Sequence, residues 1–233
     1  LVARPIIRPK PATKSIMADK ESAPAGQRAA PRTPRPEPRA WNPAAGTTAL
    51  QNHHPAPPGF PAAVTTMKIG VNTMIWSGAF DSSIPLEAIR EAGIDGIEVP
   101  VFDAADLDTA ALRRALADYG LGCTFCSVNP PGKNPISEDA SIRAGTLEHW
   151  KRIIAAAAEV GAELIAGPTY APVGYLPGRR RNPDEWIWAV EFHQQLDADL
   201  AAADVVIAVE PLNRFETYFL NTAQDTARFI DEI

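Results

Sequence analysis

The chain has 233 residues, 45% hydrophobic and 21% charged, which is the balance of a globular protein. Residues 1–66 hold nine Lys/Arg and three Asp/Glu, so residues 67–233 hold 13 and 25 and carry a net charge of −12. So acidic a body argues against a nucleic-acid partner, since affinity for phosphates comes from Lys and Arg. The sequence contains no stretch of 18 apolar residues and no apolar run of signal-peptide length in residues 1–30. We therefore expect a cytoplasmic protein without a membrane partner.

Residues 1–66 differ in composition from the rest of the chain. They contain 13 of the 23 prolines and two aromatic residues, Trp41 and Phe60. Such a segment buries too little apolar surface to offset the entropy of ordering, so we expect disorder and no contribution to the fold. A basic interaction tail, an organellar targeting segment and sequence translated upstream of the natural start are all open interpretations. The third is favoured because Leu1 is not an ordinary initiator, whereas Met67 directly precedes the first expected strand.

From Met67 onward, short apolar strands alternate with helices that have recognisable caps. The strands are expected at 68–73, 96–99, 122–128, 163–166 and 205–209, and the helices at 83–92, 108–119, 138–160, 182–203 and 223–233. The expected N-caps are Ser83, Asp108, Ser137, Asn182 with Glu185 in a capping box, and Thr222. The last strand is nearly all β-branched, which predicts burial on both of its faces.

This alternation is typical of a parallel α/β sheet. Five βα units in residues 67–233 take about 33 residues each, so eight would need about 265, close to the ~250 of a TIM (β/α)₈ barrel. The last helix has no C-cap glycine and no turn after it, which suggests that the natural chain continues. The fold prediction is therefore an incomplete TIM barrel of about five βα units over residues 67–233.

In such a barrel the reacting groups come from the carboxyl ends of the strands and the loops behind them. The strongest signal is Val-Glu-Pro-Leu-Asn-Arg-Phe-Glu at 209–216, where Glu210 ends an apolar strand and Glu216 follows six residues later. An unpaired charge at a buried strand end is costly, so we expect Glu210 to bind a metal or another cation. The alternative is an ion pair with Arg214.

These residues resemble a known family. Met67–Val71 with Trp76, and above all Glu210–Glu216 with Leu220–Thr222, are similar to the ketose 3-epimerases of the D-tagatose and D-allulose (psicose) type. Those enzymes belong to the xylose-isomerase-like sugar phosphate isomerase/epimerase superfamily. The resemblance covers roughly residues 67–233. It implies a ketose substrate, a homo-oligomer at full length, and a divalent metal, Mn²⁺ or Co²⁺, with Mg²⁺ as a further option.

The resemblance also assigns roles to individual residues. It makes Glu210 both a metal ligand and one of two acid/base carboxylates, and it makes Glu216 a substrate-binding residue. Asn72 stands where an aromatic residue commonly ends the first strand, and Phe80 takes the place of the tryptophan that follows it. Both are therefore expected to contact substrate, with the stereochemistry of the sugar left open.

The reaction type fits these residues independently of the resemblance. Epimerisation next to a ketone removes a weakly acidic C–H proton, which a carboxylate can abstract while a metal stabilises the enediolate. A second carboxylate must return the proton on the other face. The resemblance places that group, with an Asp and two His for the metal, on strands six to eight, so we expect this chain alone to be inactive. The four histidines, His53, His54, His149 and His193, are expected to be solvated or structural.

Two further patterns bear on the function, and several alternative functions fit the sequence. Cys123 and Cys126 lie three apart along a strand and so face opposite sides, which favours buried thiols over a redox pair. Arg179–Arg181 suits a substrate phosphate or a solvated loop. Alternative functions are hydroxypyruvate isomerase, an inosose-type or sugar-phosphate isomerase/epimerase, and an inactive fragment. An apurinic-site endonuclease is disfavoured because the early strand ends lack His and the body is acidic.

Overall fold

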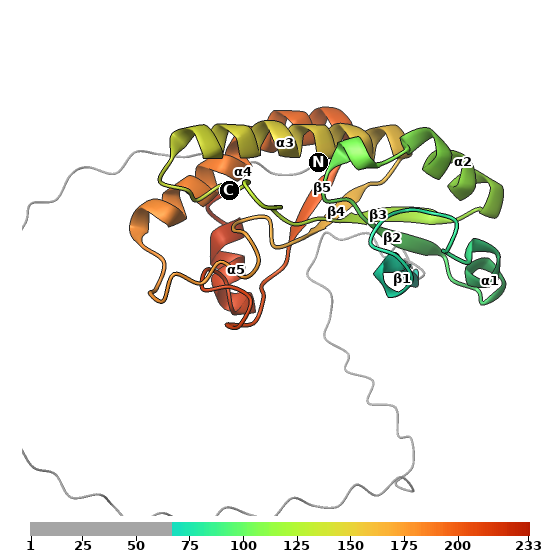
Figure 1. Ribbon diagram of the computed structural model, residues 1–233, viewed down its shortest axis with the longest axis horizontal. Coiled ribbons are helices and arrows are strands. Elements are labelled where there is room, and N and C mark those ends of the chain that lie inside the picture. The colour runs from blue at the N-terminus through green and yellow to red at the C-terminus, as the bar shows by residue number, and fades with distance from the viewer. Residues whose placement is uncertain (1–66) are drawn as a thin grey trace, which may run out of the picture. The chain divides into compact units, whose positions relative to one another are not determined.

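The computed structural model describes residues 67–233, so the expectations for residues 1–66 lie outside the described part of the chain. Five parallel strands form one sheet in the order of the sequence (Figure 1). The strands are β1 (Gly70–Asn72), β2 (Gly96–Pro100), β3 (Gly122–Cys126), β4 (Leu164–Gly167) and β5 (Val206–Val209). The helices are α1 (Leu86–Glu91), α2 (Thr109–Tyr119), α3 (Ala140–Val160), α4 (Pro183–Ala203) and α5 (Ala223–Ile230), with 3₁₀ turns η1 (Thr73–Ile75) and η2 (Ala104–Asp106). The predicted alternation of strand and helix is confirmed.

Most helix boundaries follow from the caps that the sequence contains. Asp108 accepts from Ala111 N at the start of α2, and Asn182 forms the expected capping box with Glu185. The two predicted serine caps are wrong. Helix α1 begins behind Pro85 with no side-chain cap, and α3 is capped by Asp139 instead of Ser137. A carboxylate at the N-cap accepts a hydrogen bond from a backbone N–H and also complements the positive end of the helix dipole, which explains why Asp139 is the cap.

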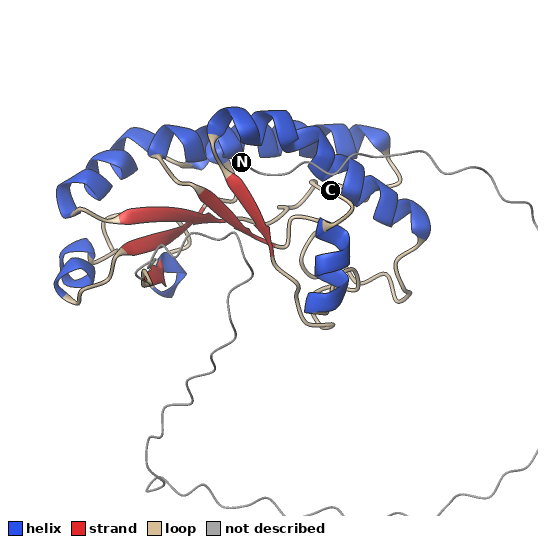
Figure 2. Cartoon of the chain, turned by 180° about the vertical axis from the view of Figure 1, so that it is seen from behind, coloured by secondary structure: helices blue, strands red, loops and turns tan. Residues whose placement is uncertain are grey.

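One face of the sheet packs against the long helices and forms the main core. The register aligns Val99 with Phe125, and Phe125 with Ile165, and all three side chains are fully buried. Trp150 from α3 and Leu196 from α4 are buried in the same cluster. Figure 2 shows the long helices on this side of the strands. Among the described residues, no helix is both long and apolar enough to cross a membrane.

The other face of the sheet corresponds to the inside of a barrel. Here the register places Asn72 beside Glu98, and Cys126 beside Ala166. Val206 at the start of β5 is 60% exposed, so the prediction that the last strand is buried on both faces is wrong. Residues of α1 to α4 pack into the core on the outer face, and nothing among residues 67–233 covers Val206 on the inner one.

A chain of buried polar groups joins the long helices to the loops behind β3 and β4. Trp150 Nε1 donates to Asn129 Oδ1 at 2.8 Å, and Asn129 Nδ2 donates to the Thr169 carbonyl at 2.9 Å. His193 lies 2.7 Å from the Ala189 carbonyl through Nδ1 and 2.6 Å from the Thr169 hydroxyl through Nε2. Because a carbonyl can only accept, Nδ1 carries the proton and Nε2 accepts from Thr169. His193 is therefore structural, one of the two roles expected for it.

This buried histidine predicts a pH dependence of stability. Burial lowers the pKa of His193 from 6.5 to about 4. As the pH drops, the unfolded chain takes up a proton near pH 6.5, whereas the native state does so only near pH 4. The free energy of unfolding should therefore decrease as the pH is lowered from about 6.5 to about 4. The slope is at most about 1.4 kcal/mol per pH unit. Urea unfolding of the wild type and His193→Gln at several pH values isolates the effect, and identical slopes for the two proteins would contradict it.

Candidate active site

The backbone around Glu210 is fixed at the carboxyl end of the sheet. Glu210 directly follows β5, its N–H donates to the Gly167 carbonyl at 3.0 Å, and its own carbonyl accepts from Tyr170 Oη at 3.1 Å. Gly167 has φ +145°, and a Cβ at this position would lie 2.0 Å from the Ser127 carbonyl oxygen. Glycine therefore permits the close approach of the strand ends at this edge.

Asn72 is held on the inner face by Glu98. Its Nδ2 donates to Glu98 Oε1 at 2.6 Å, while its Oδ1 accepts from Met74 N at 2.8 Å. Glu98 is the site residue that sequence reasoning missed. The signal was present, since Ile97 and Val99 are buried against the helices and strand alternation turns the residue between them to the other face.

The register and strand alternation place Cys126 and Glu210 on this face as well. Cys126 pairs with Ala166, which pairs with Ala208, two residues before Glu210. Burial raises the pKa of the Cys126 thiol to about 11, with the charges of Glu98 and Glu210 adding to the rise. The four side chains of Asn72, Glu98, Cys126 and Glu210 therefore make one group, called here the inner-face cluster. Cys123 belongs to the opposite face, where it packs against the core and burial raises its pKa to about 12. The two cysteines thus lie on opposite sides of β3, as expected.

The loop behind β5 holds Glu216 against the loop behind β4, where the Gly174 N–H donates to the Glu216 carbonyl at 2.7 Å. Asn213 accepts from Phe215 N through Oδ1 at 2.9 Å and donates from Nδ2 to the Glu216 carboxylate. Asn221 Nδ2 donates to the carbonyls of Leu212 and Thr217, each at 2.9 Å. These bonds fold residues 211–221 into a compact loop. The Glu216 carboxylate remains exposed on this loop beyond the carboxyl end of β5, which is called the rim below.

The surroundings of Glu210 correct two expectations. Its side chain is exposed, so the strand end is not buried as predicted, because no described residue covers it. Among residues 67–233, no ion pair joins Glu210 to Arg214. The Arg214 guanidinium instead lies 5.7 Å from the ring centroid of Phe215. The ion-pair alternative is therefore wrong, and within the described part of the chain Glu210 has no cationic partner.

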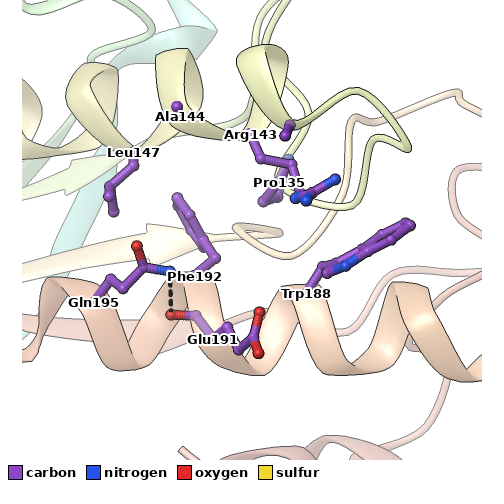
Figure 3. A pocket seen from close by; sticks show the side chains of 9 residues that line it. Pro135, Arg143, Ala144, Leu147, Trp188, Glu191, Phe192 and Gln195 are labelled. Atoms are coloured by element: carbon purple, nitrogen blue, oxygen red, sulfur yellow. Dashed lines mark hydrogen bonds between the residues drawn. The ribbon is translucent and has the colours of Figure 1, made fainter.

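The structure does not bring Phe80 to this group. Phe80 packs against the main core, and it lines a surface pocket with Ile84, Asp108 and Tyr119 on the α1 and α2 side. A second cavity lies between α3 and α4, where the Arg143 guanidinium sits 4.4 Å from the Trp188 ring (Figure 3). Neither cavity is lined by Glu216 or by a member of the inner-face cluster.

The arginine run after β4 is largely engaged within the protein. Arg179 pairs with Glu185 at 2.7 Å, and Arg181 pairs with Asp225 at 3.2 Å. Of the three guanidiniums, those of Arg179 and Arg181 are thus bound by carboxylates of the chain itself. This arrangement leaves little of the run for a substrate phosphate.

The described residues include donor groups of a kind that suits a metal, but they do not form a metal site. Carboxylate oxygens suit Mn²⁺ and Mg²⁺, and both Glu98 and Glu210 present carboxylates on the inner face. Within residues 67–233, however, no group of three or more His, Cys, Asp or Glu lies close enough together to hold an ion. His149 and His193 are buried in helices. The donor type fits a divalent metal, but the described residues do not form a complete site.

Removing the Tyr170 hydroxyl should loosen the strand-five loop. Tyr170 is fully buried, and its Oη donates to the carbonyls of Glu210 at 3.1 Å and Leu220 at 3.4 Å, so it ties the two ends of the loop together. We expect Tyr170→Phe to lower the free energy of unfolding by about 1–2 kcal/mol, measured in urea. Tyr119→Phe, at an exposed position on α2, is the matched control. Equal stability of the two variants would contradict this prediction.

Comparison with known proteins decides the family. The family model described as the xylose isomerase-like TIM barrel matches residues 86–233. The chain belongs to this family. The family fold confirms the predicted TIM barrel class, of which the five described βα units form a part.

Relatives of the chain include proteins named as sugar epimerases. The chain is 30% identical over 169 residues to a probable ketose 3-epimerase of Synechocystis sp., covering 72% of this chain and 59% of that protein. It is 32% identical over 169 residues to an L-ribulose 3-epimerase of Mesorhizobium japonicum, covering 71% and 56%. The chain therefore spans less than two thirds of the length of these curated relatives.

Solved structures agree on the fold. An L-ribulose 3-epimerase structure superposes with a TM-score of 0.64 at 31% identity, covering 72% of this chain and 57% of the other. A D-allulose 3-epimerase of Methylomonas sp. in complex with D-allulose superposes with a TM-score of 0.67 at 24% identity, covering 71% and 58%.

Proposed function

We propose that the protein epimerises a ketose at C3 by removing and returning a proton through an enediolate. The observation that carries the proposal is the position of Glu210. Its carboxylate is exposed at the carboxyl end of β5, on the face that a TIM barrel uses for catalysis. The similarity to proteins named ketose 3-epimerase and L-ribulose 3-epimerase supports a ketose as the substrate class.

In the proposed reaction Glu210 acts as the base. Its carboxylate takes the C3 proton, the C3–H bonding pair moves to form the C2–C3 double bond, and the C2 carbonyl becomes an enediolate oxygen. A divalent ion such as Mn²⁺, Co²⁺ or Mg²⁺, when bound, supplies positive charge that stabilises this oxygen. A second acid then delivers a proton to the opposite face of C3. We assign that acid to the part of the relatives that has no counterpart in this chain. Residues 1–233 alone are therefore expected to be inactive.

The remaining proposed roles concern sugar binding. Glu216, exposed at the rim, is proposed to accept hydrogen bonds from sugar hydroxyls. Asn72, fixed by Glu98, is proposed to contact the same sugar from the end of β1. Phe80 keeps its proposed substrate role from the resemblance alone, since its described contacts lie with the core. A homo-oligomer is proposed for the complete enzyme.

Product analysis tests this function. The protein as its gene encodes it is treated with a chelator, resupplied with Mn²⁺, Co²⁺ or Mg²⁺, and incubated separately with L-ribulose and D-allulose. We expect the C3 epimer of at least one sugar, at a rate that depends on the added ion. An aldose as the main product would favour an isomerase of the same superfamily, and no turnover of any ketose would overturn the proposal.

A further inference from the structure

A buried carboxylate joins the two loops behind β4 and β5. Glu185, in the first turn of α4, is 3% exposed and receives four hydrogen bonds. Arg179 donates to both of its oxygens, at 2.7 and 3.0 Å, in a forked pair. Asn182 N donates to Oε2 at 2.8 Å, and Tyr218 Oη donates to Oε1 at 2.8 Å. Arg179 belongs to the loop after β4, and Tyr218 belongs to the loop after β5.

The groups in this network stabilise each other's protonation states. Burial by itself would raise the pKa of Glu185, but the bonds from Arg179, Asn182 and Tyr218 outweigh it and hold the pKa below its usual value. Burial and the neighbouring Glu185 charge raise the pKa of Tyr218, so its hydroxyl stays protonated and remains a donor. Each oxygen of Glu185 thus already accepts two hydrogen bonds. The Glu185 carboxylate is therefore occupied by hydrogen bonds within the protein and is not available to take part in a reaction.

The network is anchored close to Glu216. Tyr218 lies two residues after Glu216, and the Glu216 carbonyl accepts from Gly174 N at 2.7 Å. One residue further on, the Phe219 carbonyl accepts from Arg181 Nη1. The backbone around Glu216 is therefore tied to the β4 loop on one side and, through Tyr218, to the start of α4 on the other.

We propose that Glu185 and Tyr218 are positioning residues that hold the loop carrying Glu216 in the geometry that receives the sugar. This inference rests on the proposed sugar-binding role of Glu216. The forked pair with Arg179 fixes the direction of the Glu185 carboxylate as well as its charge. Because Tyr218 donates to this fixed carboxylate, the position of its ring is set, and with it the position of the preceding backbone that carries Glu216.

Tyr218→Phe tests the proposal because it removes one hydroxyl and leaves Arg179, Glu185 and the capping box in place. Tyr175→Phe is the matched control, since the Tyr175 ring lies 5.8 Å from that of Tyr218 and its hydroxyl takes part in no hydrogen bond among residues 67–233. The readouts are hydrogen exchange at amides 213–219, the dissociation constant of the ketose by calorimetry, and kcat with KM, all on the metal-loaded protein as its gene encodes it.

For Tyr218→Phe we expect faster exchange at amides 213–219 and a dissociation constant raised about tenfold, with kcat changed less than about threefold. Tyr175→Phe should match the wild type in all three readouts. Wild-type exchange and sugar affinity in Tyr218→Phe would overturn the proposal, as would a lower thermal midpoint with no change in either. The exchange readout does not depend on sugar, so a failure of Glu216 as a sugar ligand, seen in Glu216→Gln, is distinguishable from a failure of this network.

Discussion

Glu210→Gln is expected to reduce proton exchange at C3 of the ketose by about 10²- to 10⁴-fold, the usual contribution of a positioned base. The amide keeps the size of the side chain and one ligating oxygen, but it has neither the charge nor the basicity of the carboxylate. Metal affinity should fall as well, because a neutral amide oxygen binds a divalent ion less strongly than a carboxylate. The loss should therefore appear in the proton-transfer step together with a lower metal content.

The experiment compares exchange with solvent deuterium and metal content by elemental analysis. Glu163→Gln is a matched control, because Glu163 is exposed and precedes β4 at the opposite edge of the sheet from Glu210. It should retain wild-type exchange and metal content. Near-normal exchange and full metal content in Glu210→Gln would show that Glu210 is a structural residue and not the base.

Glu216→Gln is expected to weaken ketose binding about ten- to a hundredfold while leaving metal content unchanged. The reason is the loss of a charge-assisted hydrogen bond to the sugar, worth about 1.5–3 kcal/mol. In the structure the Glu216 carboxylate is held by Asn213 and exposed at the rim, and it is not part of the inner-face cluster. Its substitution should therefore damage binding and positioning more than the ion.

Calorimetric titration with the ketose and elemental analysis separate these effects. The Glu210 and Glu216 substitutions should fail differently, one in chemistry with loss of metal and the other in affinity with metal retained. Loss of metal in Glu216→Gln to the same extent as in Glu210→Gln would show that the division of roles between the two glutamates is wrong.

Local signals in the sequence were sufficient for the order and type of the elements. Asp108, Asn182 and Thr222 act as the caps that their side chains predict, because an N-cap bond forms within three residues. At α3 the local pattern predicted the wrong residue, since Asp139, two residues after Ser137, caps the helix in its place. The burial of β5 was misjudged for a different reason, since it depends on what lies against the sheet.

In the candidate site, too, some features follow from the local sequence and others depend on tertiary contacts. The position of Glu210 at a strand end follows from chain order, but its exposure and the absence of a described ion pair with Arg214 depend on tertiary structure. Glu98 was detectable from strand alternation, whereas its bond to Asn72 requires the β1–β2 register. The contact of Glu185 with Tyr218 joins residues 33 apart in sequence, and no local pattern predicts it.

The most direct test of the account follows deuterium from solvent into the ketose. The metal-loaded protein, as its gene encodes it, is incubated in D₂O with the ketose that it turns over, and the label is located by NMR. Removal of the C3 proton by Glu210 predicts deuterium at C3 of both epimers and none at C1, with the signal lost in Glu210→Gln. Label at C1, or turnover to the epimer without any label at C3, would contradict the proposed reaction.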